Sequence, residues 1–396
     1  MASVCFYFQV HQPYRLRRFS IFDRSSDYFD NRQNREILGR VARNCYLPAN
    51  AVIHELLRRF EGRFRVSYSI SGVALEQFRQ HVPEVVESFQ KLAATGCVEF
   101  LAETYYHSLS FLYSRDEFLA QVQMHRRLIG ELFGAAPTVF RNTELIYNNE
   151  VARAAAKMGF SVVLCEGADH ILGYRSPAIL YHPPHLPEVR LLLKNYRLSD
   201  DIAFRFSDRG WAEWPLTADK FAEWVHQVNG NGQVVNLFLD YETFGEHQWA
   251  ETGIFEFLRH LPARVLERPE NDFKTPSECA KCYAPSGKYD VPHMISWADE
   301  SRDLSAWLGN AMQSNALHEL YRIEPLVLES GDEELLSDWR RLQTSDHFYY
   351  MSTKYFADGA VHKYFNPYDT PYDAFINFMN VLDHMRARLG QRPSGP

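Results

Sequence analysis

The sequence has no run of about 18 consecutive apolar residues, the length that a transmembrane helix needs. Its first residues, MASVCFYFQVHQPYRLRR, also lack the basic segment that opens a secretory signal peptide. The apolar stretch near the start is interrupted early, by the polar side chains of Gln9 and His11. These two absences predict a cytoplasmic protein with no membrane partner.

The short motifs of several enzyme classes are absent as well. The phosphate-binding patterns GxGxxG and GxxxxGK[ST] and the nucleophilic-serine pattern GxSxG occur nowhere in the chain. Positive charge is not in excess, since 42 Lys and Arg stand against 50 Asp and Glu without long blocks of like charge. We therefore expect no cofactor and no nucleic-acid partner, and the sequence has no signal of oligomeric state.

Cysteine is scarce, with six in 396 residues. Only Cys279 and Cys282 lie close together, in the segment CAKC. A structural zinc site would need a second close pair, which does not exist, so reduced thiols are favoured over zinc. Disulfide bonds are not expected in a cytoplasmic chain.

Apolar and aromatic residues, by contrast, are plentiful. Hydrophobic residues make up 46% of the chain and aromatic residues 14%. This is enough for a large core, and aromatic rings also suit a cleft that stacks against the apolar faces of sugars. Runs rich in β-branched and aromatic residues end at polar loops, as strands do. The seven runs span residues 4–10, 64–70, 97–102, 138–144, 161–166, 189–195 and 234–240.

Segments with helical spacing separate several of these runs, among them residues 51–62, 117–134, 148–160 and 217–228. Repeated alternation of strand and helix indicates a parallel sheet. Seven such strands predict an α/β fold, a seven-stranded parallel (β/α)7 barrel related to the eight-stranded one. An open doubly wound sheet is the alternative.

The pattern changes beyond the last predicted strand. We expect the catalytic barrel to span residues 1–265. Residues 266–294 are rich in Pro, Lys, Glu and Asn and are interpreted as a connecting arm. Residues 295–390 have helical spacing throughout and predict a C-terminal helical subdomain, followed by a tail at 391–396.

Polar side chains gather where the predicted strands end. Catalytic groups of parallel barrels project from these carboxyl ends. Two carboxylates from different strand ends, such as Glu144 and Asp240, are the minimum for glycoside hydrolysis, because one protonates the leaving oxygen while the other attacks the sugar or activates water. The four polar strand ends hold His11 and Gln12; Glu99, Glu103 and His107; Arg141, Asn142 and Glu144; and Asp240, Tyr241 and Glu242.

Two other interpretations compete with this one. A single carboxylate after a strand is more often a helix cap or a solvated charge, but four polar strand ends in register are not expected by coincidence. A zinc-type site is the main rival, as in barrel deacetylases. Its histidines would fall on separate loops without an HxH or HxxxH pair, so we expect no metal. The candidate metal ligands are His11, His107, Asp240 and His247.

Five short motifs follow one another along the chain. They are HQP (11–13), GCVEFLAETYYH (96–107), FRNTE (140–144), DYETFG (240–245) and SWADESRDLSAWLGN (296–310). In this order they resemble the motifs of glycoside hydrolase family 57, which contains α-amylases and other glucan-processing enzymes. The resemblance runs over nearly the whole chain and is closest to the α-amylase-like branch. It implies a seven-stranded barrel, a helical region that helps to close the active site, and metal-free hydrolysis with retention of anomeric configuration.

The resemblance also implies roles for individual residues. It makes Glu144 the nucleophile and Asp240 the acid/base, a choice between Asp240 and Glu242 that spacing leaves open. Arg141 and His247 stand where relatives often have tryptophan, so we expect altered sugar subsites there. Substrate-binding roles are implied for His11, Glu99, His107, Arg141, Glu242, His247, Trp249, Trp297, Trp307 and Asp346.

The sequence therefore predicts a retaining hydrolase of α-1,4-glucosidic bonds whose partner is an α-glucan or malto-oligosaccharide. Burial and the nearby charge of Glu144 should raise the pKa of Asp240, while Glu144 stays ionised. A 4-α-glucanotransferase or a branching enzyme would use the same two residues. A non-catalytic glucan-binding protein and a metal-dependent deacetylase-like enzyme are the alternatives from other classes.

Overall fold

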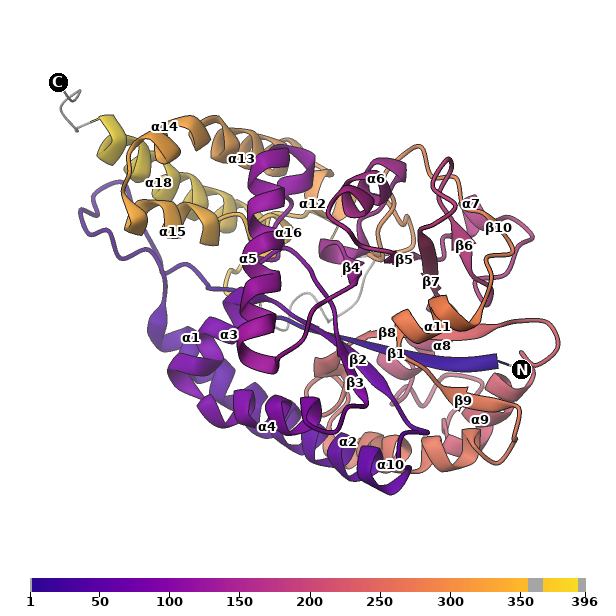
Figure 1. The fold of residues 1–396 in the computed structure, drawn as a ribbon. Coiled ribbons are helices and arrows are strands. Elements are labelled where there is room, and N and C mark those ends of the chain that lie inside the picture. Colours follow the sequence, from indigo (N-terminus) through magenta and orange to yellow (C-terminus); the bar gives the residue numbers. More distant parts are fainter. Residues whose placement is uncertain (1, 355–365, 391–396) are drawn as a thin grey trace.

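Parallel strands form the centre of the molecule (Figure 1), in a computed structural model that describes residues 2–354 and 366–390. One group of strands has the order β3-β2-β1-β8, and every neighbouring pair is parallel. A second group contains the parallel pairs β4-β5 and β5-β7. The bounds are β1 (Ala2–Val10), β2 (Val66–Ile70), β3 (Val98–Phe100), β4 (Val139–Arg141), β5 (Val162–Glu166), β7 (Arg190–Lys194) and β8 (Val234–Asp240).

Two further contacts join these groups. Ala102, just after β3, forms a parallel bridge with Phe140 of β4, and the N–H of Asn195, just after β7, donates to the carbonyl of Asn236 in β8 at 2.9 Å. The seven strands thus follow one another as β1-β2-β3-β4-β5-β7-β8 and return to β1. The predicted (β/α)7 barrel is confirmed, and all seven predicted strands are present.

Three short strands were not predicted: β6 (Tyr181–His182), β9 (Asn271–Phe273) and β10 (Gly287–Lys288). Runs of two or three residues are too short for periodicity to reveal them. β9 pairs with the first residues of β1, and β10 pairs with β6. Both β9 and β10 lie in the segment expected to be a connecting arm, together with helix α11 (Pro276–Cys282). This segment therefore adds structure to the barrel besides linking its two neighbours.

The alternation of side chains along β1 shows how the barrel is packed. Phe6 and Phe8 lie in a large apolar cluster shared with the surrounding helices, whereas Cys5 and Tyr7 belong to a second cluster with residues of the other strands, inside the barrel. The helices between the strands are α1 (Asn31–Val41), α2 (Leu47–Arg59), α3 (Gly72–His81), α4 (Pro83–Ala93), α5 (Arg115–Phe133), α6 (Asn149–Lys157), α7 (Asp169–Leu172), α8 (Tyr196–Ala203), α9 (Ala218–His226) and α10 (Ile254–Val265).

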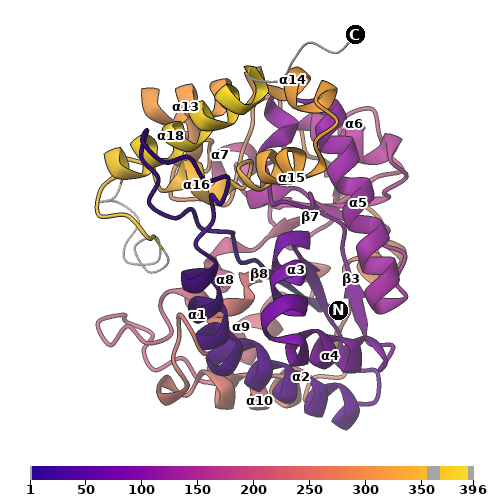
Figure 2. The same cartoon turned by 90° about the vertical axis from the view of Figure 1, so that its left-hand side faces the viewer.

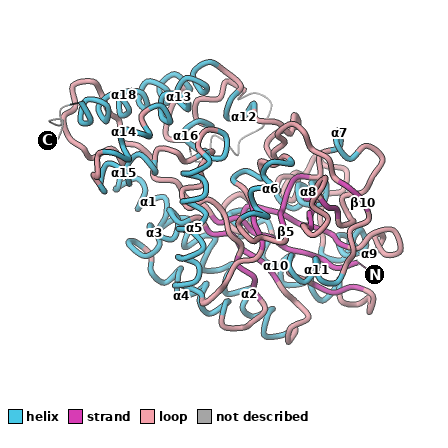
Figure 3. Tube along the Cα trace, turned by 45° about the horizontal axis from the view of Figure 1, so that its top comes forward, coloured by secondary structure: helices cyan, strands magenta, loops and turns pink. Residues whose placement is uncertain are grey.

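The C-terminal helices gather beside the barrel, as Figures 1 and 2 show. They have their own apolar core around Trp307 and Trp339, which also takes in Tyr28 from the N-terminal part. Figure 3 shows this helical group apart from the strands. Its members are α12 (Ser305–Leu308), α13 (Ala311–Arg322), α14 (Glu324–Glu329), α15 (Glu333–Arg341), α16 (Ser345–Tyr349) and α18 (Pro371–Gly390).

Helix α16 connects the helical part to the barrel. The N–H of Ser345 donates to the carbonyl of His107 at 2.9 Å, and Thr344 forms a bridge with Ser108. The first residues of α16 are therefore fixed beside the loop that follows β3. The predicted tail at 391–396 lies outside the described residues, and across the described ranges no helix combines the length and apolarity needed to cross a membrane.

Candidate active site

A cleft of about 890 Å³ opens where the strands of the barrel end and the C-terminal helices begin. Its walls come from both parts of the chain, since side chains after β1, β3, β4 and β8 face others from residues 297–350. Most of the residues predicted for the site are brought together here. Those that line the cleft are His11, His107, Glu144, Asp240, Glu242, His247, Trp297, Trp307 and Asp346.

Glu144 sits in a left-handed turn just after β4, with φ of 58°. This conformation is costly for a residue with a side chain and is retained where surrounding contacts enforce it. The Trp297 indole N–H donates to one carboxylate oxygen at 2.8 Å, and the Ser345 hydroxyl donates to the other at 2.8 Å. The ring Nε2 of His107 lies 3.4 Å from that second oxygen. The turn thus aims the carboxylate into a ring of donors.

These donors decide the ionisation of Glu144. Burial alone would raise the pKa of this carboxyl, but the hydrogen bond and positive charge of His107, together with Arg141 and Trp297, outweigh burial and lower the pKa to about 2. Glu144 is therefore an anion at any pH at which the protein is expected to work, as a nucleophile must be.

Asp240 is the last residue of β8 and behaves in the opposite way. Burial, followed by the negative charge of Glu144, raises its pKa to about 6, while Arg141 and Lys194 oppose the rise. Glu242 follows in the next turn, where burial and the charge of Asp240 raise its pKa to about 8. The Tyr46 hydroxyl donates to Glu242. Of these three groups, Glu144 stays ionised, whereas Asp240 and Glu242 hold a proton in weak acid.

Two stacked histidines lie beside Glu144, with the ring centres of His11 and His107 4.0 Å apart. Nε2 of His11 is 2.9 Å from Oδ2 of Asp346, and its Nδ1 is 2.7 Å from the Ser71 hydroxyl. Burial, and then the positive charge of His107, lower the pKa of His11. In its neutral form His11 donates to Asp346 and accepts from Ser71, which fixes its ring at the cleft wall.

Two predicted substrate ligands lie elsewhere. Glu99 is the second residue of β3, and its carboxylate accepts the N–H of Ser277 in α11 at 3.0 Å. It therefore faces α11 and does not line the cleft. Trp249 is 59% exposed and also lies outside the cleft lining. Both residues therefore lie apart from the cleft in which Glu144 and Asp240 are brought together.

Two other predicted residues have a different place from that expected. Arg141 is fully buried and lies behind the cleft lining, with its guanidinium 5.0 Å from the ring centre of Trp297. Trp307 borders the cleft but is only 1% exposed, so it has no open ring face for stacking against a sugar. Trp297 remains as the tryptophan that both lines the cleft and contacts Glu144.

Sequence reasoning missed Lys194 in the cleft lining. It is the last residue of β7, and its ammonium lies 3.2 Å from Oδ1 of Asp200 and 5.2 Å from the ring centre of Trp297. The strand-end argument that singled out Asp240 applies equally to this position, so the signal was available. Ser345 and Asp200 had no such signal, because they are placed by helices α16 and α8.

Metal-binding chemistry was the main rival interpretation. Within residues 2–354 and 366–390, no three or more His, Cys, Asp or Glu side chains are arranged to hold a metal ion.

The two cysteines of the CAKC segment differ in environment, since Cys279 is buried and Cys282 exposed.

Comparison with known proteins decides the family. Residues 5–292 match the family model described as Glycosyl hydrolase family 57. The chain belongs to glycosyl hydrolase family 57. A relative from Methanocaldococcus jannaschii, named "Putative alpha-amylase", is 44% identical over 393 residues, which cover 96% of this chain and 83% of that protein. The predicted family is confirmed, and the chain is a glycoside hydrolase or transglycosylase.

Solved structures show the same fold. A family 57 branching enzyme from Thermococcus kodakaraensis superposes with a TM-score of 0.70 at 14% identity, over 98% of this chain and 90% of its own. A 4-alpha-glucanotransferase from Thermococcus litoralis superposes with a TM-score of 0.67 at 16% identity, over 88% of this chain and 56% of its own. At these low sequence identities, the superpositions show a shared fold and do not show a shared activity.

Proposed function

We propose that this family 57 enzyme hydrolyses α-1,4-glucosidic bonds with retention of configuration, using Glu144 as nucleophile and Asp240 as acid/base. The observation that supports this most is the contrast between two carboxyl groups in one cleft. The pKa of Glu144 is lowered to about 2 and that of Asp240 is raised to about 6. Such a pair supplies an anion and a proton donor at the same pH.

The reaction proceeds in two halves. In the first, the carboxylate of Glu144 attacks the anomeric carbon while Asp240 gives its proton to the departing glycosidic oxygen, which leaves a glycosyl ester on Glu144. In the second, ionised Asp240 takes a proton from water, the water oxygen bonds to the anomeric carbon, and the ester bond to Glu144 breaks. Each half returns Asp240 to the form that the next half needs.

The remaining cleft residues bind the sugar in this scheme. Glu242 and Asp346 offer carboxyl oxygens to sugar hydroxyls, and Lys194 offers an ammonium donor. Trp297 forms one wall, and its N–H to Glu144 keeps the nucleophile and that wall in register. A malto-oligosaccharide has both the apolar ring faces and the hydroxyl groups that this lining suits.

Product analysis after incubation with maltoheptaose tests the proposal. Hydrolysis predicts shorter sugars with a growing number of reducing ends, whose anomeric configuration, read early by NMR, is that of the substrate bond. Longer and shorter sugars with a constant number of reducing ends would instead indicate transfer, as in a glucanotransferase or branching enzyme. Unchanged substrate with measurable binding would indicate a glucan-binding protein and contradict the proposal.

Matched variants assign the residues. Glu144→Gln and Asp240→Asn keep the size of each side chain and should each lower kcat by at least about a thousandfold. Glu251→Gln changes an exposed carboxylate that follows the loop after β8, and it should leave the rate unaltered. Full activity of either of the first two variants would refute its assigned role.

A further inference from the structure

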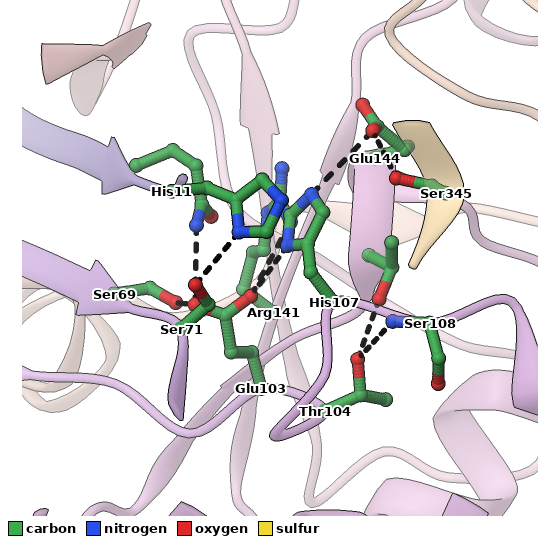
Figure 4. Close-up of polar contacts among 12 residues, drawn as sticks. His11, Ser69, Ser71, Glu103, Thr104, His107, Ser108, Arg141, Glu144 and Ser345 are labelled. Carbon is green, nitrogen blue, oxygen red and sulfur yellow. Dashed lines mark hydrogen bonds and ion pairs between the residues drawn. The ribbon is translucent and has the colours of Figure 1, made fainter. Parts of the chain in front are cut away.

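Another glutamate, Glu103, is buried directly behind the cleft. It is not itself part of the cleft lining, but it hydrogen-bonds two residues that are, His107 and Gln9. Its carboxylate accepts from Nδ1 of His107 at 2.8 Å, from the amide of Gln9 at 3.1 Å and from the Ser69 hydroxyl. The guanidinium of Arg141 is 3.9 Å away. Figure 4 shows these side chains converging on one buried carboxylate. So many donors fix both the charge and the orientation of Glu103.

His107 joins Glu103 to the nucleophile. One ring nitrogen donates to Glu103, and the other lies 3.4 Å from the carboxylate of Glu144 (Figure 4). Burial alone would lower the pKa of this imidazole, but its hydrogen bonds and charge interactions with the two carboxylates outweigh burial and raise the pKa to about 9. Glu103, His107 and Glu144 thus form a chain of anion, cation and anion.

We propose that Glu103 is a positioning residue that holds His107 as an imidazolium against Glu144 through both halves of the reaction. The proposal rests on the proposed function. When Glu144 becomes an ester it loses its negative charge, and no proton leaves His107. Glu103 is then the one anion that is still bonded to the imidazolium. When the ester bond breaks, the carboxylate of Glu144 forms again beside a positive ring, which favours its departure.

The other groups around His107 do not replace Glu103. His11 stacks on the ring, and its pKa is lowered by burial and by the positive charge of His107. Asp346 is bonded to His11. Arg141 adds a positive charge from β4. His125 of α5 accepts the backbone N–H of Glu103 and donates to the carbonyl of Ile70, and burial lowers its pKa. These neighbours add no second carboxylate bonded to His107.

Glu103→Gln tests this role, because it keeps the shape of the side chain and removes its charge. NMR of protein labelled at histidine, with the His107 signal assigned from a His107→Gln spectrum, should show the pKa of His107 falling from about 9 toward its ordinary value of 6.5. This measurement needs no substrate.

Kinetics give the second measurement. The ratio of kcat/KM in Glu103→Gln to that in the wild type, taken at each pH, cancels the effects of groups that titrate in both proteins. We expect a ratio near one at pH 5 and a loss of at least about tenfold at pH 8, the size of one charge-assisted hydrogen bond to the reacting group. The loss should be in kcat and not in KM, because Glu103 does not line the cleft.

Glu117→Gln is the matched control. Glu117 is also a buried carboxylate outside the cleft lining, and its side-chain partners are Arg340 at 2.9 Å, Gln121 at 2.8 Å and Gln343 at 3.5 Å, none of which lines the cleft. Its activity ratio should not depend on pH. An unchanged pKa of His107 in Glu103→Gln, or the same pH-independent loss in both variants, would overturn the proposal. If Glu103→Gln lowers the pKa of His107 but the wild-type protein leaves maltoheptaose intact, the positioning role of Glu103 would be supported and the α-1,4-glucan assignment would be rejected.

Discussion

The rate of maltoheptaose cleavage should depend on pH as a bell-shaped curve displaced to the acid side. The first half of the reaction needs protonated Asp240 and ionised Glu144 together. Asp240 has a pKa of about 6 and Glu144 a pKa of about 2. Raising the pH through 6 removes the proton that the leaving oxygen must receive, and lowering it through 2 neutralises the nucleophile. Hence kcat/KM should be greatest near pH 4.

The pKa of Asp240 also sets the size of the effect. At pH 7, about one tenth of the molecules retain the proton on Asp240, and this fraction falls about tenfold with each further pH step of one. The activity at pH 7 should therefore be about one tenth of its maximum, and at pH 8 about one hundredth. Burial contributes most to this behaviour and the charge of Glu144 comes second.

Initial rates at low maltoheptaose concentration, followed through new reducing ends between pH 3 and pH 8, measure this profile directly. Aliquots held at each pH and then assayed at pH 5 separate reversible titration from unfolding. Constant activity from pH 5 to pH 8, or a rate that rises through pH 6, would refute Asp240 as the proton donor.

Three further outcomes are expected. Asp240→Asn should raise the free energy of unfolding at pH 7 by about 3 kcal/mol, because a pKa raised from 3.8 to about 6 makes the ionised form destabilising above pH 3.8. Glu144→Gln should lower the free energy of unfolding by about 3 kcal/mol, because a carboxylate whose pKa is lowered from 4.5 to about 2 stabilises the fold above pH 4.5, and this stabilisation is lost as the pH falls toward 2. Urea unfolding measures both variants, and a change of the same sign in both would contradict the ionisation states of the two residues. Trp297→Phe removes the N–H that donates to Glu144 at 2.8 Å and should lower kcat about tenfold in steady-state assays, whereas Trp249→Ala, at an exposed position outside the cleft, should leave kcat/KM within about twofold.

The strands could be predicted because each is a run of β-branched and aromatic residues that ends in polar side chains. Four of the strand ends also marked a part of the site, since parallel strands in a barrel place their carboxyl ends at one mouth. Glu144 and Asp240 came from this argument, and Lys194 at the end of β7 could have come from it too. The short strands β9 and β10 could not, because two or three residues show no period.

The depth of a residue along its strand was harder to predict than its face. Glu99, Leu101 and Glu103 alternate with Phe100 and Ala102, so the period of two places all three on the same side of β3. Leu101 belongs to the apolar cluster inside the barrel. Periodicity thus assigns both glutamates to the interior but does not say that Glu99 lies near α11 and Glu103 near the mouth. To distinguish the two positions, the end of the strand must be known. β3 ends at Phe100, two residues before the end of the predicted run at residue 102.

The environment of Glu144 shows why the helical part could not be assigned a role from local patterns. His107 belongs to the barrel, but Trp297 and Ser345, which donate to the two oxygens of Glu144, come from the C-terminal third of the chain. Without these donors, fewer contacts would oppose the effect of burial on Glu144. Its pKa would then be higher and would lie closer to that of Asp240. The barrel supplies the two carboxyl groups and most of what keeps them in different ionisation states, namely burial, His107 and Arg141, and the C-terminal part adds the hydrogen bond from Trp297. The hydrogen bond from Ser345 of α16 to Glu144 joins residues that are far apart in the sequence, so no local pattern could have revealed it.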